Sequence, residues 1–159
     1  MRVLLTSHGS TGDIYPMIAL GRALQASGHE VRFATTPFFQ GEIEAAGITF
    51  IRLPPDWGAD AFRESMMLLH RTKAPLKQLG LIYRESVPYL AETIDLLDEA
   101  LKSADLLVGS YLFPGFRHVA ARRKVPFAAV NFCHNVVPLP GQAPDTLPSC
   151  NFLPPRLRR

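Results

Sequence analysis

The chain contains 159 residues with a formal net charge of +3, and 47% of its residues are hydrophobic. These values indicate one globular domain of ordinary composition. The excess positive charge lies in residues 122–124 and 156–159, and such clusters are typical of a solvated helix end and tail, so we expect no nucleic-acid binding. Two cysteines, Cys133 and Cys150, form neither a metal-binding spacing nor a disulfide framework. We recognise no secretory signal and no run of roughly 20 apolar residues, and we expect a cytoplasmic location.

The first third of the chain alternates between strand and helix patterns. Consecutive apolar residues predict a strand at residues 2–6, as in a strand that is covered on both faces. Met17, Leu20 and Leu24 fall on one helical stripe and predict a helix at 16–27, capped by Gly28. A strand at 30–35, a short helix at 38–46 and a strand at 48–53 complete this part.

The pattern changes at Pro54 and Pro55, which begin a loop. A helical region follows at 60–81, interrupted by Pro75 and Gly80. We then predict elements in this order: a helix at 87–103, a strand at 105–109, a helix at 113–124 and a strand at 126–132. Strands that alternate with helices imply right-handed crossovers. The predicted fold is therefore α/β, a Rossmann-like doubly wound parallel sheet with helices on both faces.

Prolines recur without any helical or strand periodicity after residue 137. Such a segment is typical of a loop or linker. We therefore expect a Rossmann-like domain at residues 1–137 and a proline-rich linker at 138–159. We also expect this linker to lead to a further domain of a longer protein.

The turn after the first strand carries the candidate catalytic residues, Asp13 and His8. Gly9 and Gly12 frame this turn with a GxxG spacing, which is neither the dinucleotide fingerprint nor a P-loop. Asp13 can cap the following helix, or it can accept a proton from a bound hydroxyl. His8 is the alternative base, a group that orients the acceptor, or a hydrogen-bonded turn residue.

Three segments together resemble the N-terminal half of GT-B glycosyltransferases of families 28 and 1: residues 6–16 (TSHGSTGDIYP), 19–24 (ALGRAL) and 28–31 (GHEV). A second match covers residues 105–132. The similar types are sterol and lipid glucosyltransferases, antibiotic-aglycone glycosyltransferases and the bacterial lipid II N-acetylglucosaminyltransferase. The resemblance implies one half of a two-domain fold, in which the N-terminal domain binds the acceptor and the C-terminal domain binds the nucleotide sugar.

The resemblance also implies an inverting transfer of a hexose to a hydroxyl of an apolar acceptor, such as a lipid, a sterol or a natural-product aglycone. Asp13 falls on the base of the antibiotic and sterol branches, whereas plant and lipid II enzymes use a histidine. Plant enzymes pair that histidine with an aspartate, and Ser110 stands at that position here. The implied co-substrate is a UDP-hexose, with no cofactor and no metal in this domain. Because the donor-binding motif is absent from these residues, we expect the chain alone to be inactive.

The loops after the strands and the predicted helical region at 60–81 supply the candidate acceptor-binding residues. They are Gly9, Ser10, Thr11, Gly12, Trp57, Phe62, Met66, Ser110, Phe113, His134 and Asn135. For Trp57, packing under its own loop is the alternative, and for Phe62 and Met66 it is packing within a helix core. The basic, apolar stretch 66–84 is either a solvated helix surface or a site of peripheral contact with an anionic membrane.

Two other functions are alternatives to the acceptor-binding half of a glycosyltransferase. One is a stand-alone, noncatalytic subunit that recruits the acceptor or the membrane for a split glycosyltransferase. The other is a generic Rossmann-like binder of a small molecule or nucleotide, which would need a phosphate-binding turn that these residues lack.

Overall fold

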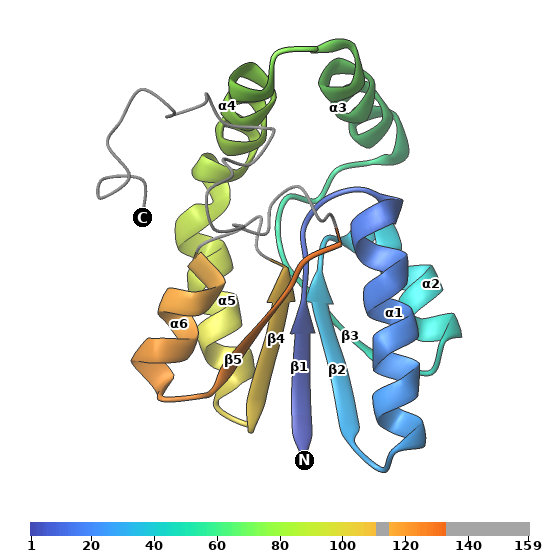
Figure 1. Ribbon diagram of the computed structural model, residues 1–159, viewed down its shortest axis with the longest axis vertical. Helices are drawn as coiled ribbons and strands as arrows, with labels where there is room; N and C mark the ends of the chain where they lie inside the picture. Colours follow the sequence, from blue (N-terminus) through green and yellow to red (C-terminus); the bar gives the residue numbers. More distant parts are fainter. Residues whose placement is uncertain (111–114, 133–159) are drawn as a thin grey trace, which may run out of the picture.

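A five-stranded parallel sheet forms the centre of the protein in the computed structural model, which describes residues 1–110 and 115–132. The strands lie in the order β3-β2-β1-β4-β5 (Figure 1). Their bounds are β1 (Arg2–Thr6), β2 (Glu30–Thr35), β3 (Thr49–Arg52), β4 (Leu106–Ser110) and β5 (Phe127–Val130). This arrangement confirms the predicted Rossmann-like, doubly wound α/β fold.

Helices cover both faces of the sheet and also its upper edge (Figure 1). One face carries α1 (Thr11–Ala26) and α2 (Gln40–Ala45), which follows the 3-10 turn η1 (Pro37–Phe39). The other face carries α5 (Leu90–Leu101) and α6 (Gly115–Arg123). Beyond the carboxyl ends of the strands lie α3 (Ala59–Arg71) and α4 (Pro75–Ser86), and the turn η2 (Val87–Tyr89) joins α4 to α5.

Alternating residues of the first strand divide the core into two layers, because successive side chains of a strand point to opposite faces. Val3 and Leu5 pack with Phe33 toward α1 and α2. Leu4 packs with Leu97 toward α5 and α6. All of these side chains are buried, which explains why β1 reads as an unbroken apolar run.

Helix α1 begins at Thr11, and the predicted start at residue 16 is wrong. The carbonyl of Ser10 accepts hydrogen bonds from the backbone N–H groups of Asp13, at 2.9 Å, and Ile14, at 3.1 Å. Pro16 therefore lies inside the helix, where its nitrogen cannot donate to Gly12. The helix tolerates this loss because Gly12 is exposed, so water can satisfy its carbonyl.

The region predicted at 60–81 forms two helices, and the break falls just before Pro75. Ala74 adopts an extended backbone with ψ of 119°, as expected for a residue that precedes proline. Gly80 lies within α4 and does not interrupt it. The predicted helix at 87–103 is split into η2 and α5. The predicted linker at 138–159 lies outside the described residues.

The order of the strands places a topological switch point between β1 and β4. The chain leaves β1 through α1 toward β2, and it leaves β4 through α6 toward β5 on the other side. Open α/β sheets typically bind ligands at the carboxyl ends of the strands near such a point. The turn after β1 lies at this end of the sheet, below α3 and α4 (Figure 1).

Close packing of α1 on the sheet predicts that Gly21 cannot carry a side chain. A Cβ atom there would lie 2.7 Å from Ile48 Cδ1 and 3.0 Å from Leu5 Cδ1. Gly21→Val should lower the free energy of unfolding by about 1–3 kcal/mol in urea denaturation. The control Gly41→Val, where a Cβ meets nothing within 4 Å, should change it by less than about 0.5 kcal/mol. Equal effects of the two variants would contradict this packing.

Candidate functional site

The turn between β1 and α1 is held from the neighbouring strand. The Thr35 hydroxyl, at the end of β2, donates a hydrogen bond of 2.6 Å to the carbonyl of Ser7. Both residues are fully buried, so this link fixes the chain just before His8. Gly9 then adopts a φ of 135°, a conformation that side chains disfavour, and turns the backbone toward α1.

The Asp13 carboxylate lies against this turn and accepts two hydrogen bonds on one oxygen. The backbone N–H of Ser10 donates to Oδ2 at 2.9 Å, and the Ser10 hydroxyl donates to the same atom at 3.1 Å. A Cβ atom on Gly9 would lie only 2.3 Å from Asp13 Oδ2, so glycine is required there. Asp13 is half-buried, and its Oδ1 takes no hydrogen bond within the described part of the chain.

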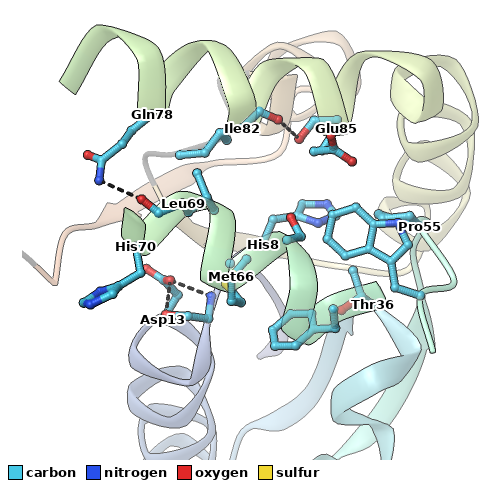
Figure 2. Close-up of a pocket in the computed structure, with 16 residues that line it drawn as sticks. His8, Asp13, Thr36, Pro55, Met66, Leu69, His70, Gln78, Ile82 and Glu85 are labelled. Carbon is cyan, nitrogen blue, oxygen red and sulfur yellow. Dashed lines mark hydrogen bonds between the residues drawn. The ribbon is translucent and has the colours of Figure 1, made fainter. Parts of the chain in front are cut away.

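A cavity of about 350 Å³ opens above this turn and reaches to α3 and α4 (Figure 2). It brings together seven of the residues predicted from the sequence: His8, Gly9, Ser10, Asp13, Trp57, Phe62 and Met66. Its size is at the lower end of the range typical of sites for small molecules. The mixture of an apolar wall with a few polar groups is also typical of such sites.

His8 lies in the floor of the cavity as a neutral imidazole. Its ring stacks on Phe116 with centroids 5.7 Å apart and an interplanar angle of 16°. Although the residue keeps some solvent exposure, protein surrounds the ring. Burial disfavours the charged form and lowers the pKa of His8 from 6.5 to about 4. The imidazole therefore stays uncharged at neutral pH.

Phe62 and Trp57 show how the cavity wall joins the core. Phe62 stacks on Phe38 with ring centroids 4.1 Å apart and meets Phe39 edge-on at 5.5 Å. Trp57 lies 6.5 Å from Phe62, measured between ring centroids, and is half-buried. Phe62 thus packs in the core and also lines the cavity, so the two alternatives considered from the sequence do not exclude each other.

The cavity also contains nine residues outside the candidate set. Helix α3 adds Ser65, Leu69 and His70, helix α4 adds Gln78, Ile82, Glu85 and Ser86, and the loops add Thr36 and Pro55. The spacing of three and four along α3 and α4 places each set on one helical face. The spacing in the sequence indicates that the residues of each helix share a face. It does not indicate that this face lies toward the turn after β1, because that depends on how the helices pack.

Three other predicted residues, Thr11, Gly12 and Ser110, do not line this cavity. Thr11 and Gly12 are exposed on the first turn of α1. Ser110 is fully buried at the end of β4. Phe113, His134 and Asn135 lie outside the described residues.

Within residues 1–110 and 115–132, no group of three or more His, Cys, Asp or Glu side chains is arranged to hold a metal ion. In the same part of the chain, every helix is too short or too polar to cross a bilayer.

Comparison with known proteins places these features in a family. A sterol 3-beta-glucosyltransferase of Gibberella zeae is 32% identical over 127 residues, which is 80% of this chain and 8% of the fungal protein. Glycosyltransferase GtfE of Amycolatopsis orientalis is 30% identical over 151 residues, which is 91% of this chain and 34% of that protein. The chain thus spans about a third or less of the length of these relatives.

Solved structures support the same fold. The Streptomyces sp. SF2575 glycosyltransferase SsfS6, complexed with thymidine diphosphate, has a TM-score of 0.62 at 22% identity, over 81% of this chain and 38% of the other. MurG of Acinetobacter baumannii has a TM-score of 0.54 at 15% identity, over 80% of this chain and 34% of the other. Residues 3–131 match the family described as the glycosyltransferase family 28 N-terminal domain. The chain therefore belongs to this family, and its fold is that of one half of a GT-B glycosyltransferase.

Proposed function

We propose that this chain is the acceptor-binding part of an inverting glycosyltransferase and that Asp13 is its general base. The observation that carries this proposal is the position of the Asp13 carboxylate. Ser10 anchors Oδ2, and the residue lines an open, largely apolar cavity. An acceptor alcohol with an apolar body suits this cavity, and lipids, sterols and natural-product aglycones all have this character.

In the proposed reaction, the acceptor oxygen attacks the anomeric carbon of the sugar donor. The new C–O bond forms while the bond from that carbon to the diphosphate oxygen breaks, and the nucleoside diphosphate leaves with the electron pair. The hydroxyl proton passes to the Asp13 carboxylate. Since Ser10 occupies Oδ2, Oδ1 is the atom that accepts it. A positioned base of this kind accelerates a reaction by about 10²–10⁴-fold.

Asp13 suits this role better than His8. A histidine base becomes a cation when it accepts the proton, and burial next to Phe116 opposes that charge, as the lowered pKa of about 4 indicates. The carboxylate instead becomes neutral on protonation. We assign to His8 the role of a neutral group that borders the acceptor hydroxyl.

The sugar donor binds elsewhere in this proposal. Among the described residues that line the cavity there is no Lys or Arg, the side chains that usually hold a diphosphate. The start of α1, which could attract a phosphate, already contacts the Asp13 carboxylate. We propose that a C-terminal domain in a longer protein binds the donor, a UDP-hexose, and that the chain alone does not transfer sugar.

We also propose that the enzyme works in the cytoplasm and contacts membranes peripherally. Met67, Leu68 and Leu76 are exposed apolar side chains on α3 and α4, and Lys73 and Lys77 lie close to them in the sequence. Apolar residues mixed with basic ones favour an anionic lipid surface.

Removal of the base should abolish most of the activity in a full-length protein that contains this chain. Asp13→Asn should lower kcat by about 10²–10⁴-fold with little change in acceptor affinity, because the amide keeps the shape but cannot take the proton. The readout is product formation from UDP-glucose with a panel of apolar alcohols. Asp60→Asn is the matched control, since Asp60 is exposed on α3. Unchanged turnover in Asp13→Asn would refute the assignment and transfer the role of the base to His8 or another residue.

Gly9→Ala should act on catalysis through Asp13. The added Cβ would displace the carboxylate from the Ser10 donors, so we expect kcat to fall by about 10²-fold. Gly80→Ala is the control, because a Cβ there meets nothing within 4 Å. If Gly9→Ala retains full kcat while folding normally, the position of the carboxylate is not important.

The lowered pKa of His8 predicts a pH dependence of stability. Between pH 6.5 and 4 the unfolded state binds a proton at this residue and the folded state does not, so stability is full above pH 6.5 and is lost toward pH 4. Over this window, wild type should lose about 3 kcal/mol more unfolding free energy than His8→Gln. Urea denaturation across the window measures the difference, and parallel curves would contradict the burial of a neutral ring.

A further inference from the structure

A second carboxylate, that of Glu85, borders the cavity from the side opposite Asp13. Asp13 approaches from the start of α1, whereas Glu85 approaches from α4 (Figure 2). Apolar side chains of α3 and α4, including Met66, Leu69 and Ile82, line the space between them. A ligand that fills the cavity would therefore meet one carboxylate near each end.

One oxygen of Glu85 remains available to a ligand. Arg84, its neighbour in sequence, donates to Oε1 from Nε at 3.1 Å and from Nη2 at 3.0 Å. No described residue donates to Oε2. The Arg84 side chain is 64% exposed and does not line the cavity, so solvent screens its charge.

The other polar groups of α4 are already engaged. Gln78 donates from Nε2 to the carbonyl of Leu69 at 3.1 Å, and the Ser86 hydroxyl donates to the carbonyl of Ile82 at 2.8 Å. The acidic side chains in the described lining are Asp13 and Glu85, and the exposed guanidinium of Arg84 pairs with Glu85 from outside the cavity. Each end of the cavity therefore presents a carboxylate oxygen that accepts no hydrogen bond from the described residues.

We infer that the cavity selects acceptors whose end remote from the reacting hydroxyl carries a hydrogen-bond donor, either a neutral hydroxyl or an amine, and rejects acceptors that are anionic there. Glu85 is the residue that sets this selectivity, because its Oε2 accepts a hydrogen bond from such a donor and repels a carboxylate or phosphate. This inference rests on the proposed acceptor-binding function and narrows the class of acceptor.

Three ligands with one common body test the inference directly. They are 3-hydroxy steroids whose side chain ends in a primary alcohol, a primary amine or a carboxylate. Trp57 is the single tryptophan of the chain and lines the cavity, so its fluorescence reports binding at pH 7.5. We expect the alcohol and the amine to bind about tenfold more tightly than the carboxylate, since juxtaposed like charges disfavour binding.

Two variants separate the position of Glu85 from net charge. Glu85→Gln should bind the carboxylate about fivefold more tightly than wild type does and should lose the preference for the amine. Asp60→Asn removes the same charge from α3, but Asp60 is exposed and lines neither this cavity nor the neighbouring hollow that contains Glu85, so its affinities should match wild type. Circular dichroism and thermal unfolding confirm that each variant is folded.

The outcomes distinguish this inference from the proposed function. Equal affinity for all three steroids, or equal effects of Glu85→Gln and Asp60→Asn, would overturn the selectivity while leaving an acceptor site in place. A carboxylate that is rejected as strongly by Glu85→Gln as by wild type would overturn the role of Glu85. If the folded chain binds none of the three, the acceptor-binding function fails, and this inference fails with it.

Discussion

The contact between the Asp13 carboxylate and the Gly9–Ser10 turn is the interaction on which the site depends. It satisfies the Ser10 backbone N–H at the start of α1, places negative charge at the positive end of the helix, and requires that Gly9 lack a side chain. The same hydrogen bonds hold the carboxylate at the floor of the cavity. In the proposed function, the carboxylate that caps the helix is also the positioned base, and neither role needs an additional element of structure.

The site combines a rigid floor with a separate helical wall. The floor lies at the ends of parallel strands, where buried residues such as Thr35 fix the turn after β1. The wall comes from α3 and α4, and α3 contains no fully buried residue. Its side chains Phe62, Met66 and Leu69 line the cavity, whereas Met67 and Leu68 are exposed. The proposed function therefore assigns the chemistry to the floor and the recognition of the acceptor to the wall, as in other folds that carry function on connections above a scaffold.

Charge and burial act together in this cavity. Burial keeps the His8 ring neutral, and the acidic side chains in the described lining are Asp13 and Glu85. A diphosphate finds no cationic side chain among the described lining residues, whereas an alcohol finds apolar surface and hydrogen-bond acceptors. In the two proposals, the lack of a Lys or Arg in the described lining disfavours the diphosphate of the sugar donor, and the Glu85 carboxylate disfavours anionic acceptors.

Local patterns in the sequence determined the strands, the order of the elements and the candidate residues at the first turn. Apolar runs predicted β1 and β2 with their observed bounds, and Gly28 follows the end of α1 with a φ of 82°. Such features depend on neighbours within a few residues. The early start of α1 was missed, because it depends on hydrogen bonds between Ser10 and Asp13 that outweigh the effect of Pro16. Only the tertiary structure brought Glu85 to the cavity of Asp13 and buried His8 against Phe116, because contacts between residues distant in sequence depend on how helices pack above and beside the sheet.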